Sequence, residues 1–180
     1  YGVLDRGSLV KIGNDLPLHE AALFGCAVMT GAGAVINTAR ILPGDSVAIV
    51  GLGGVGLSGL LGAVLAGAEK IVAIDLSDEK LGLARQLGAT HTINATDPDH
   101  VEQAHDITNG GVDFAFDLAG TIKAMETAYE VTRYGGSVVT AGLSPSVEKF
   151  ACNQSNLVSQ EKSIRGSYMG SCVPVRDIPR

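Results

Sequence analysis

The feature that most constrains the fold is the glycine turn Gly51-Leu52-Gly53-Gly54-Val55-Gly56. It follows the apolar run Ser46–Val50 and precedes a segment of small apolar residues, Leu57–Ala66. A buried strand, a glycine turn and a helix in this order are typical of a dinucleotide-binding unit. Because the chain has 24 glycines, a chance match is easy, and the turn alone is a weak indication of dinucleotide binding. The strand before it and the helix after it make the indication stronger.

Each glycine of the turn has a separate expected role. Gly51 permits the tight turn off the strand, Gly53 lets the backbone approach a pyrophosphate, and Gly56 lets the helix pack closely on the sheet. Free N–H groups at the start of the helix would then face the phosphates, where the helix dipole favours negative charge.

The acid Asp75 ends the next apolar run, 24 residues after Gly51. The expected offset for an acid that binds the adenosine ribose is roughly 20 residues. A 2'-phosphate about 4 Å from this carboxylate would cost roughly 4 kcal/mol at an effective dielectric near 20. No Arg follows within residues 76–78, so NAD is favoured over NADP. The alternative is that Asp75 merely caps the next helix, although Ser77 would cap it equally well.

Apolar, β-rich runs alternate with helical patterns along most of the chain. The runs are Ser46–Val50, Lys70–Asp75, His91–Asn94, Val112–Asp117, Ser137–Ala141 and Ser163–Tyr168, and the helical patterns are Gly54–Ala66, Ser77–Leu87, Asp99–Thr108 and Thr121–Thr132. This alternation predicts an α/β protein with a doubly wound six-stranded parallel sheet, the Rossmann fold. The cofactor should cross the carboxyl ends of the strands.

The flanking segments are less regular. We expect a fragment of β structure in residues 1–13, two short helices interrupted at Gly25 in residues 18–39, and a loop with a short helix before Gln160. The domain prediction is an entry segment (1–24), a dinucleotide-binding domain (25–172) and an exit linker (173–180). Since the chain begins at Tyr1 and not Met, we interpret it as a processed protein or a fragment.

Composition excludes several classes. A net charge of −6 without a basic stripe argues against nucleic acid. The uncharged stretches 21–39 and 46–68 raise the question of a membrane span, but parallel strands covered on both faces give similar runs, so we expect none. Three cysteines without C-x-x-C spacing form neither a disulfide framework nor a zinc knuckle, and a cytoplasmic location is the default.

The segments Gly25–Ala34 and Pro43–Val47, together with the glycine turn and Asp75, resemble the zinc-dependent medium-chain alcohol dehydrogenases. The likeness extends over nearly the whole chain. It implies the coenzyme-binding domain of an enzyme that oxidises alcohols to aldehydes or ketones by hydride transfer to NAD, with short pieces of a catalytic domain at both ends.

The resemblance also implies roles for single residues. Cys26 would be the third protein ligand of the catalytic zinc, whereas its own context indicates a buried free thiol. Lys80, otherwise a solvated helix residue, would reach the adenosine ribose. The remaining candidates for cofactor contact are Thr30 and Val55 on the nicotinamide side, main-chain groups of Ala141, Ser167 and Met169 at the carboxamide, Leu118 and Ala119 at the adenosine, and Gly51, Gly53, Gly54 and Gly56 in the turn.

The sequence also departs from this family. Members are about twice as long, and their other zinc ligands, proton relay and structural-zinc lobe have no counterpart here. We expect all four histidines to be solvated side chains and not zinc ligands: His19, His91, His100 and His105. We therefore expect this chain alone to bind NAD without turnover. The last strand, Ser163–Tyr168, would pair across a two-fold axis, with dimer or tetramer left open.

Two other functions are compatible with the glycine turn. One is a zinc-free, NADPH-dependent quinone or enoyl reductase domain, against which Cys26 and Asp75 argue. The other is a non-enzymatic NAD-binding module. A methyltransferase that uses S-adenosylmethionine has a similar glycine turn and acid, but the six-strand pattern and the Gly25-Cys26 segment fit it poorly. The alcohol substrate is not specified by the sequence.

Overall fold

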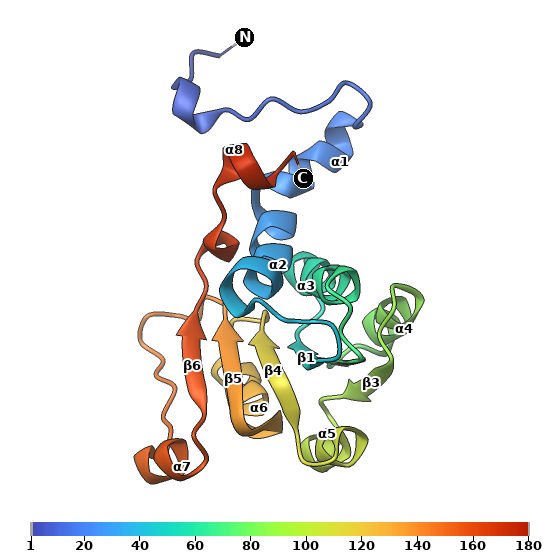
Figure 1. Ribbon diagram of the computed structural model, residues 1–180, viewed down its shortest axis with the longest axis vertical. Helices are drawn as coiled ribbons and strands as arrows, with labels where there is room; N and C mark the ends of the chain where they lie inside the picture. The colour runs from blue at the N-terminus through green and yellow to red at the C-terminus, as the bar shows by residue number, and fades with distance from the viewer. Residues whose placement is uncertain (1, 180) are drawn as a thin grey trace.

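The computed structural model describes residues 2–179 and contains one six-stranded sheet (Figure 1). Every strand pair is parallel and the strand order is β3-β2-β1-β4-β5-β6. The strands are β1 (Ser46–Val50), β2 (Lys70–Asp75), β3 (His91–Asn94), β4 (Val112–Asp117), β5 (Thr132–Thr140) and β6 (Ser163–Gly166). This order confirms the predicted doubly wound fold.

Helices cover both faces of the sheet and are α3 (Gly54–Leu65), α4 (Asp78–Gln86), α5 (His100–Thr108) and α6 (Ile122–Val131). Side chains of β1 alternate between two cores. Val47 and Ile49 pack with α3 and α4, whereas Ala48 and Val50 pack with α5 and α6. Burial on both faces explains why β1 is a continuous apolar run, and the stretch 46–68 divides into strand, turn and helix as predicted.

The N-terminal helix differs from the prediction, because Leu18–Ala39 is one unbroken helical segment. It comprises α1 (Leu18–Leu23), the π-helical η2 (Phe24–Val28), α2 (Met29–Gly33) and the π-helical η3 (Ala34–Ala39). Gly25 keeps a right-handed helical backbone inside η2, so the predicted interruption there is wrong; the helix ends only at Arg40, whose φ is +61°. By length and composition alone, this helix is apolar enough to cross a membrane.

The described part of the N-terminal segment, residues 2–13, forms no strand and contains only the 3₁₀ turn η1 (Arg6–Ser8). The prediction of β structure there is wrong. Val3 is fully exposed and Leu4 is largely exposed, and the segment runs away from the sheet, so no strand edge lies beside it (Figure 1).

The C-terminal third follows the prediction in outline. A short helix, α7 (Gln154–Ser159), interrupts the loop before β6, as expected. Beyond β6, the chain forms the 3₁₀ turn η4 (Met169–Ser171) and then the helix α8 (Pro174–Asp177), which lies within the predicted exit linker. The amide of Val173 donates to the Asp177 carboxylate over 2.7 Å.

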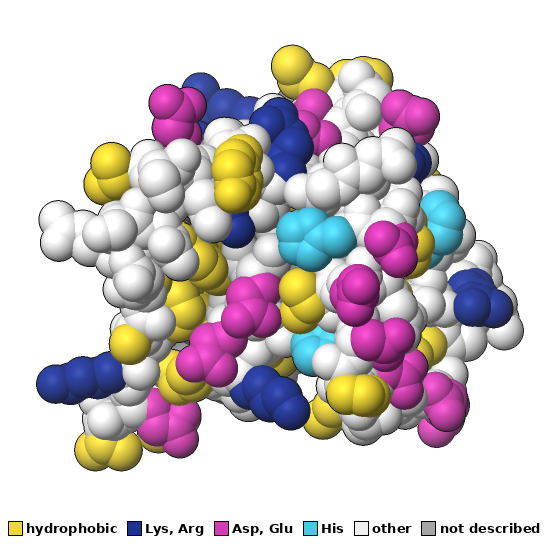
Figure 2. Space-filling model, turned by 90° about the horizontal axis from the view of Figure 1, so that it is seen from below, with side chains coloured by type: hydrophobic (Ala, Val, Ile, Leu, Met, Phe, Trp, Pro, Cys, Tyr) yellow, Lys and Arg dark blue, Asp and Glu magenta, His cyan; other side chains and the backbone are white. Residues whose placement is uncertain are grey.

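The surface seen from below the sheet is mixed in charge. Figure 2 shows basic side chains interspersed with carboxylates on this face. This arrangement agrees with the negative net charge of the chain and gives no continuous basic stripe on the face in view.

Candidate functional site

The turn after β1 is closely packed at both ends. Gly51 has a φ of +90°, and a Cβ on it would lie 2.6 Å from the Cβ of Ala119. A Cβ on Gly56 would collide with the carbonyl oxygen of Gly51, so the first turn of α3 rests directly on the glycine turn. These contacts agree with the expected structural roles of Gly51 and Gly56.

Gly53, in contrast, faces open space. It is the N-cap of α3, and no side chain caps this helix. A Cβ on Gly53 would meet no atom within 4 Å. The first amides of α3 therefore lack intrahelical partners next to open space, at the positive end of the helix dipole. This cradle fits a pyrophosphate.

Asp75 connects the end of β2 to the glycine turn. One carboxylate oxygen accepts the amide of Leu52 over 2.6 Å and lies 3.8 Å from the Nζ of Lys80, and the other accepts the amide of Ser77 over 3.0 Å. The hydroxyl of Ser77 accepts the amide of Lys80, so Ser77 is the N-cap of α4. The alternative that Asp75 merely caps this helix is therefore wrong.

A cavity of about 340 Å³ lies at the carboxyl ends of the strands. Of the predicted cofactor residues it contains Gly51, Gly53, Asp75, Lys80, Leu118 and Ala119. The cavity is also lined by Thr121, Lys123 and Thr127 of the α6 region, which were not predicted from the sequence. They could have been predicted, because α6 begins five residues after β4 ends and so starts at the same edge of the sheet as the cavity.

A second group of predicted residues lies where the helix Leu18–Ala39 meets the chain after β6. Thr30 is 8% exposed, and its Oγ1 lies 4.0 Å from the Sδ of Met169. The amide of Ser167 donates to the Thr140 carbonyl over 2.8 Å, and the amide of Ala141 donates to the Asp117 carbonyl over 3.0 Å. Thr30, Ser167 and Met169 are thus brought together, outside the cavity at Asp75.

The start of α3 contacts the helix that carries Cys26. A Cβ on Gly31 would collide with the Val55 carbonyl oxygen, and a Cβ on Gly54 would lie 3.5 Å from the Cβ of Ala27. Only glycine at position 31 allows the two helices to approach this closely. Val55, Gly54 and the turn that carries Cys26 are therefore neighbours.

Cys26 itself is exposed, so the interpretation as a buried thiol is wrong. Within residues 2–179, no group of three or more His, Cys, Asp or Glu side chains could hold a metal ion. The histidines belong to other contacts: His100 and His105 bond main-chain carbonyls near α5 and α6, His91 lies 2.9 Å from the Thr90 hydroxyl, and His19 is 84% exposed beside Glu20. The described residues do not fit a complete zinc site.

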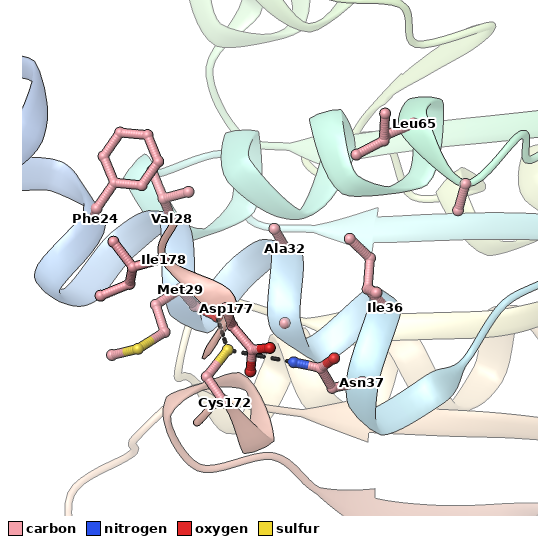
Figure 3. Close-up of a pocket in the computed structure, with 12 residues that line it drawn as sticks. Phe24, Val28, Met29, Ala32, Ile36, Asn37, Leu65, Cys172, Asp177 and Ile178 are labelled. Atoms are coloured by element: carbon pink, nitrogen blue, oxygen red, sulfur yellow. Dashed lines mark hydrogen bonds between the residues drawn. The ribbon is translucent and has the colours of Figure 1, made fainter. Parts of the chain in front are cut away.

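A larger cavity of about 490 Å³ lies away from the glycine turn (Figure 3). Its walls are mainly the apolar side chains Phe24, Val28, Met29, Ile36, Leu65 and Ile178, with Asn37, Cys172 and Asp177 along one side. None of the predicted cofactor residues lines it. An apolar space without a cluster of acids, bases or nucleophiles offers no evident chemistry, so the smaller cavity is the better candidate.

The comparisons with known proteins agree with this geometry. Residues 54–180 match the family model described as zinc-binding dehydrogenase. Alcohol dehydrogenase 2 of Zea mays is 36% identical over 182 aligned residues, which cover 99% of this chain and 48% of the relative. The chain thus spans about half the length of the curated relatives it matches.

Solved structures give the same picture. Benzyl alcohol dehydrogenase from Acinetobacter calcoaceticus matches with a TM-score of 0.90 at 36% identity, covering 94% of this chain and 47% of the other. A putative zinc-binding dehydrogenase from Sinorhizobium meliloti, bound to NADP, matches with a TM-score of 0.78 at 28% identity, covering 85% of this chain and 46% of the other.

Proposed function

Because this chain belongs to the zinc-binding dehydrogenase family, we propose that it is the coenzyme-binding part of an NAD-dependent alcohol dehydrogenase. The whole enzyme oxidises an alcohol to an aldehyde or ketone. NAD, when bound, supplies the nicotinamide ring that accepts the hydride. The division into residues 1–24, 25–172 and 173–180 is part of this proposal.

The observation that carries the proposal is the hydrogen bond from Leu52 to Asp75 beside the open space at Gly53. It sets a carboxylate and a helix N-terminus around one cavity. In our proposal, amides at Gly53 to Gly56 bind the pyrophosphate, and Asp75 and Lys80 bind the ribose hydroxyls. Leu118 and Ala119 flank the adenosine.

The nicotinamide half is proposed to lie nearer the helix Leu18–Ala39. Thr30 and Val55 would pack on the ring, and main-chain groups of Ala141, Ser167 and Met169 would hold the carboxamide. The short distance between Thr30 and Met169 supports this grouping. So does the position of Ser167, directly after the carboxyl end of β6.

Cys26 is proposed as one zinc ligand whose partners lie outside the described residues. A catalytic zinc needs three protein ligands, and the resemblance assigns only one of them, Cys26, to this chain. We therefore propose that the 180-residue chain binds NAD but does not turn over alcohol. We also propose that the enzyme works in the cytoplasm and that it associates through β6. Among residues 2–179, β6 pairs only with β5 and so forms one open edge of the sheet.

The proposal is tested by calorimetric titration of the purified chain with NADH, together with an assay for alcohol oxidation with and without added Zn²⁺. We expect saturable binding of one NADH per chain and no turnover in either assay. Failure to bind NADH would contradict the proposed function. Zinc-dependent turnover would contradict the part that assigns the other ligands to a segment outside this chain.

A second candidate is a zinc-free reductase domain that uses NADPH, and one observation favours its choice of cofactor but not the absence of zinc. The Sinorhizobium meliloti structure was solved with NADP bound. Asp75 opposes this assignment, because its carboxylate would lie close to a 2'-phosphate. A comparison of NADH with NADPH separates the two candidates.

A further inference from the structure

The segment after β6 has an unusual backbone. Three consecutive residues lie in the left-handed region, with φ of 50° at Met169, 65° at Gly170 and 50° at Ser171. Residues with a side chain rarely adopt this conformation, and it persists only where surrounding contacts hold it. Contacts with other parts of the chain must therefore hold this segment in place.

The hydroxyl of Thr38 bridges the two ends of the segment. Its Oγ1 lies 2.8 Å from the Oγ of Ser167 and 2.8 Å from the Oγ of Ser171. Thr38 belongs to η3, more than 120 residues away in the sequence. One side chain thus links Ser167, directly after β6, to Ser171, the last of the three left-handed residues.

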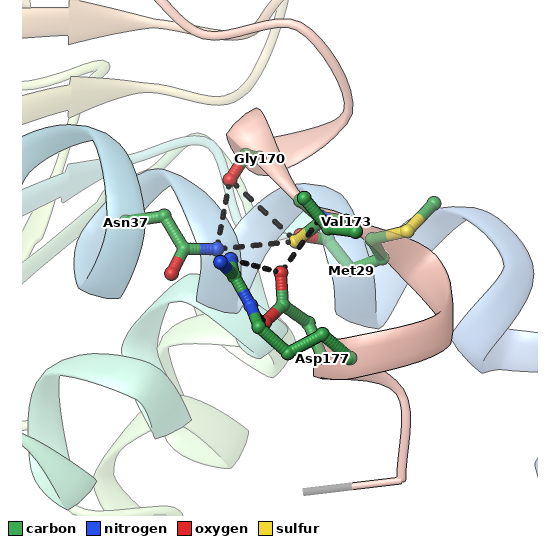
Figure 4. A network of polar contacts seen from close by, with 7 residues as sticks. Met29, Asn37, Gly170, Val173 and Asp177 are labelled. Atoms are coloured by element: carbon green, nitrogen blue, oxygen red, sulfur yellow. Dashed lines mark hydrogen bonds and ion pairs between the residues drawn. The ribbon is translucent and has the colours of Figure 1, made fainter.

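Asn37 holds the middle of the same segment (Figure 4). Its Nδ2 donates to the Gly170 carbonyl over 3.2 Å and to the Sγ of Cys172 over 3.3 Å. The Cys172 thiol in turn donates to the Met29 carbonyl over 3.3 Å. Asn37 therefore links the segment to the helix from which it projects.

The backbone of the segment lies directly on α2. A Cβ on Gly170 would collide with the Met29 carbonyl oxygen and lie 2.7 Å from the Cα of Gly33. Thr30, one turn after Cys26, reaches Met169 from the same helix. The helix that carries Cys26 and Thr30 thus also sets the shape of the chain from Ser167 to Met169.

We propose that Thr38 and Asn37 are positioning residues that hold Ser167 to Met169 in the shape needed to receive the nicotinamide half of the cofactor. This inference rests on the proposed function. Neither side chain is assigned a contact with the cofactor, and each acts through Ser167 or Gly170. The adenosine half depends on Asp75 and Lys80, which are held by separate contacts. Loss of Thr38 or Asn37 should therefore weaken binding of the nicotinamide half alone.

The test compares NADH with ADP-ribose, which lacks the nicotinamide, by calorimetric titration of the 180-residue chain. Thr38→Val keeps the shape of the side chain and removes the hydroxyl, whereas Thr38→Ser keeps the hydroxyl. Because Thr38→Val removes both hydrogen bonds of the Thr38 hydroxyl, we expect it to weaken NADH binding roughly fivefold or more. ADP-ribose binding should not change, and Thr38→Ser should bind NADH like the original chain.

The test includes a second positioning variant and a control variant. Asn37→Asp removes the donor to Gly170 at constant size and should give the same selective loss, which also covers a failure of Thr38→Val to fold. Thr108→Val is the matched control, because it removes a hydroxyl hydrogen bond at the end of α5 and should leave NADH and ADP-ribose equally bound.

The outcomes separate this inference from the proposed function. Equal losses for both ligands, no loss for either, or a Thr38→Ser variant as weak as Thr38→Val would overturn the positioning role. An original chain that binds NADH no more tightly than ADP-ribose would also overturn it, while leaving NAD binding intact. An original chain that binds neither ligand would overturn the proposed function itself.

Discussion

The main-chain amide of Leu52 donates a hydrogen bond of 2.6 Å to the carboxylate of Asp75. The acid at the end of β2 and the glycine turn after β1 are therefore one structural unit. A hydrogen bond to a carboxylate is stronger than one between neutral groups. Asp75 thus orients the turn, and in the proposed function the same carboxylate distinguishes the two forms of the cofactor.

Gly53→Ala should separate binding from folding. The backbone of Gly53 (φ −74°, ψ −172°) suits any residue, and a Cβ there would project into open space. We expect the melting temperature to change by less than about 2 °C, since little stability is lost. NADH affinity should fall on the order of tenfold or more, because the methyl group blocks approach of the pyrophosphate. Unchanged NADH affinity in calorimetry would contradict this assignment.

Gly56→Ala should instead destabilise the fold. Its Cβ would collide with the Gly51 carbonyl oxygen, and a backbone atom is displaced only by a shift of α3. We expect a loss of about 3 kcal/mol in the free energy of unfolding, measured with urea. Gly82→Ala is the control. It lies in α4 with no atom within 4 Å of the added Cβ, so it should raise stability by up to about 1 kcal/mol.

Asp113 should make stability depend on pH in the acid range. Burial tends to raise the pKa of Asp113, but hydrogen bonds from Ser46 and the charge and hydrogen bonds of Arg133 outweigh it, so the pKa lies below the usual 3.8. A lowered pKa in the folded state stabilises the protein above pH 3.8, and this contribution is lost as the pH falls through the folded-state value.

Asp113→Asn tests this dependence. We expect the variant to be about 2 kcal/mol less stable than the original chain at pH 7, because hydrogen bonds to a charged group are lost. The difference should shrink as the pH is lowered below 3.8. Denaturant titrations at several pH values measure it, and a difference independent of pH would refute the role of the charge.

The cysteines should differ in their reaction with iodoacetamide. Burial raises the pKa of the Cys172 thiol, and the carboxylate of Asp177 raises it further. Cys26 and Cys152 are exposed. At pH 7.5 we expect peptide mass spectrometry to find these two alkylated well before Cys172, since the thiolate is the reactive form. The rate at Cys172 should continue to rise above pH 9, and rapid alkylation at neutral pH would count against the packing described for it.

The sequence predicted the central fold well for a physical reason. The strands β1, β2, β3 and β4 have the predicted bounds. For β1, β2 and β4 the reason is that a buried parallel strand is a largely apolar run, which here ends at a glycine or an acid. The predicted ends of the last two strands were less accurate. β5 begins at Thr132, five residues before the prediction, where its register with β4 shifts between Val112 and Phe114. β6 ends at Gly166, short of Tyr168.

Features that depend on distant contacts were missed. The break predicted at Gly25 is absent, because Gly25 does not adopt the left-handed conformation with which a glycine commonly ends a helix. Thr38 and Asn37 gave no signal in the sequence, since their partners lie more than 120 residues away. Lys123 lies on the helix that follows β4, and a prediction based on the ends of the strands does not include it.

The most direct test of the account is calorimetric titration of this chain and of Asp75→Ala with NADH and with NADPH, with Asp106→Ala, which removes an exposed carboxylate on α5, as the control. The account predicts that the original chain and the control bind NADH in preference to NADPH. Asp75→Ala should weaken NADH binding and reduce or remove the preference, because the repulsion against a 2'-phosphate is gone. Preference of the original chain for NADPH, or an unchanged preference in Asp75→Ala, would contradict the account.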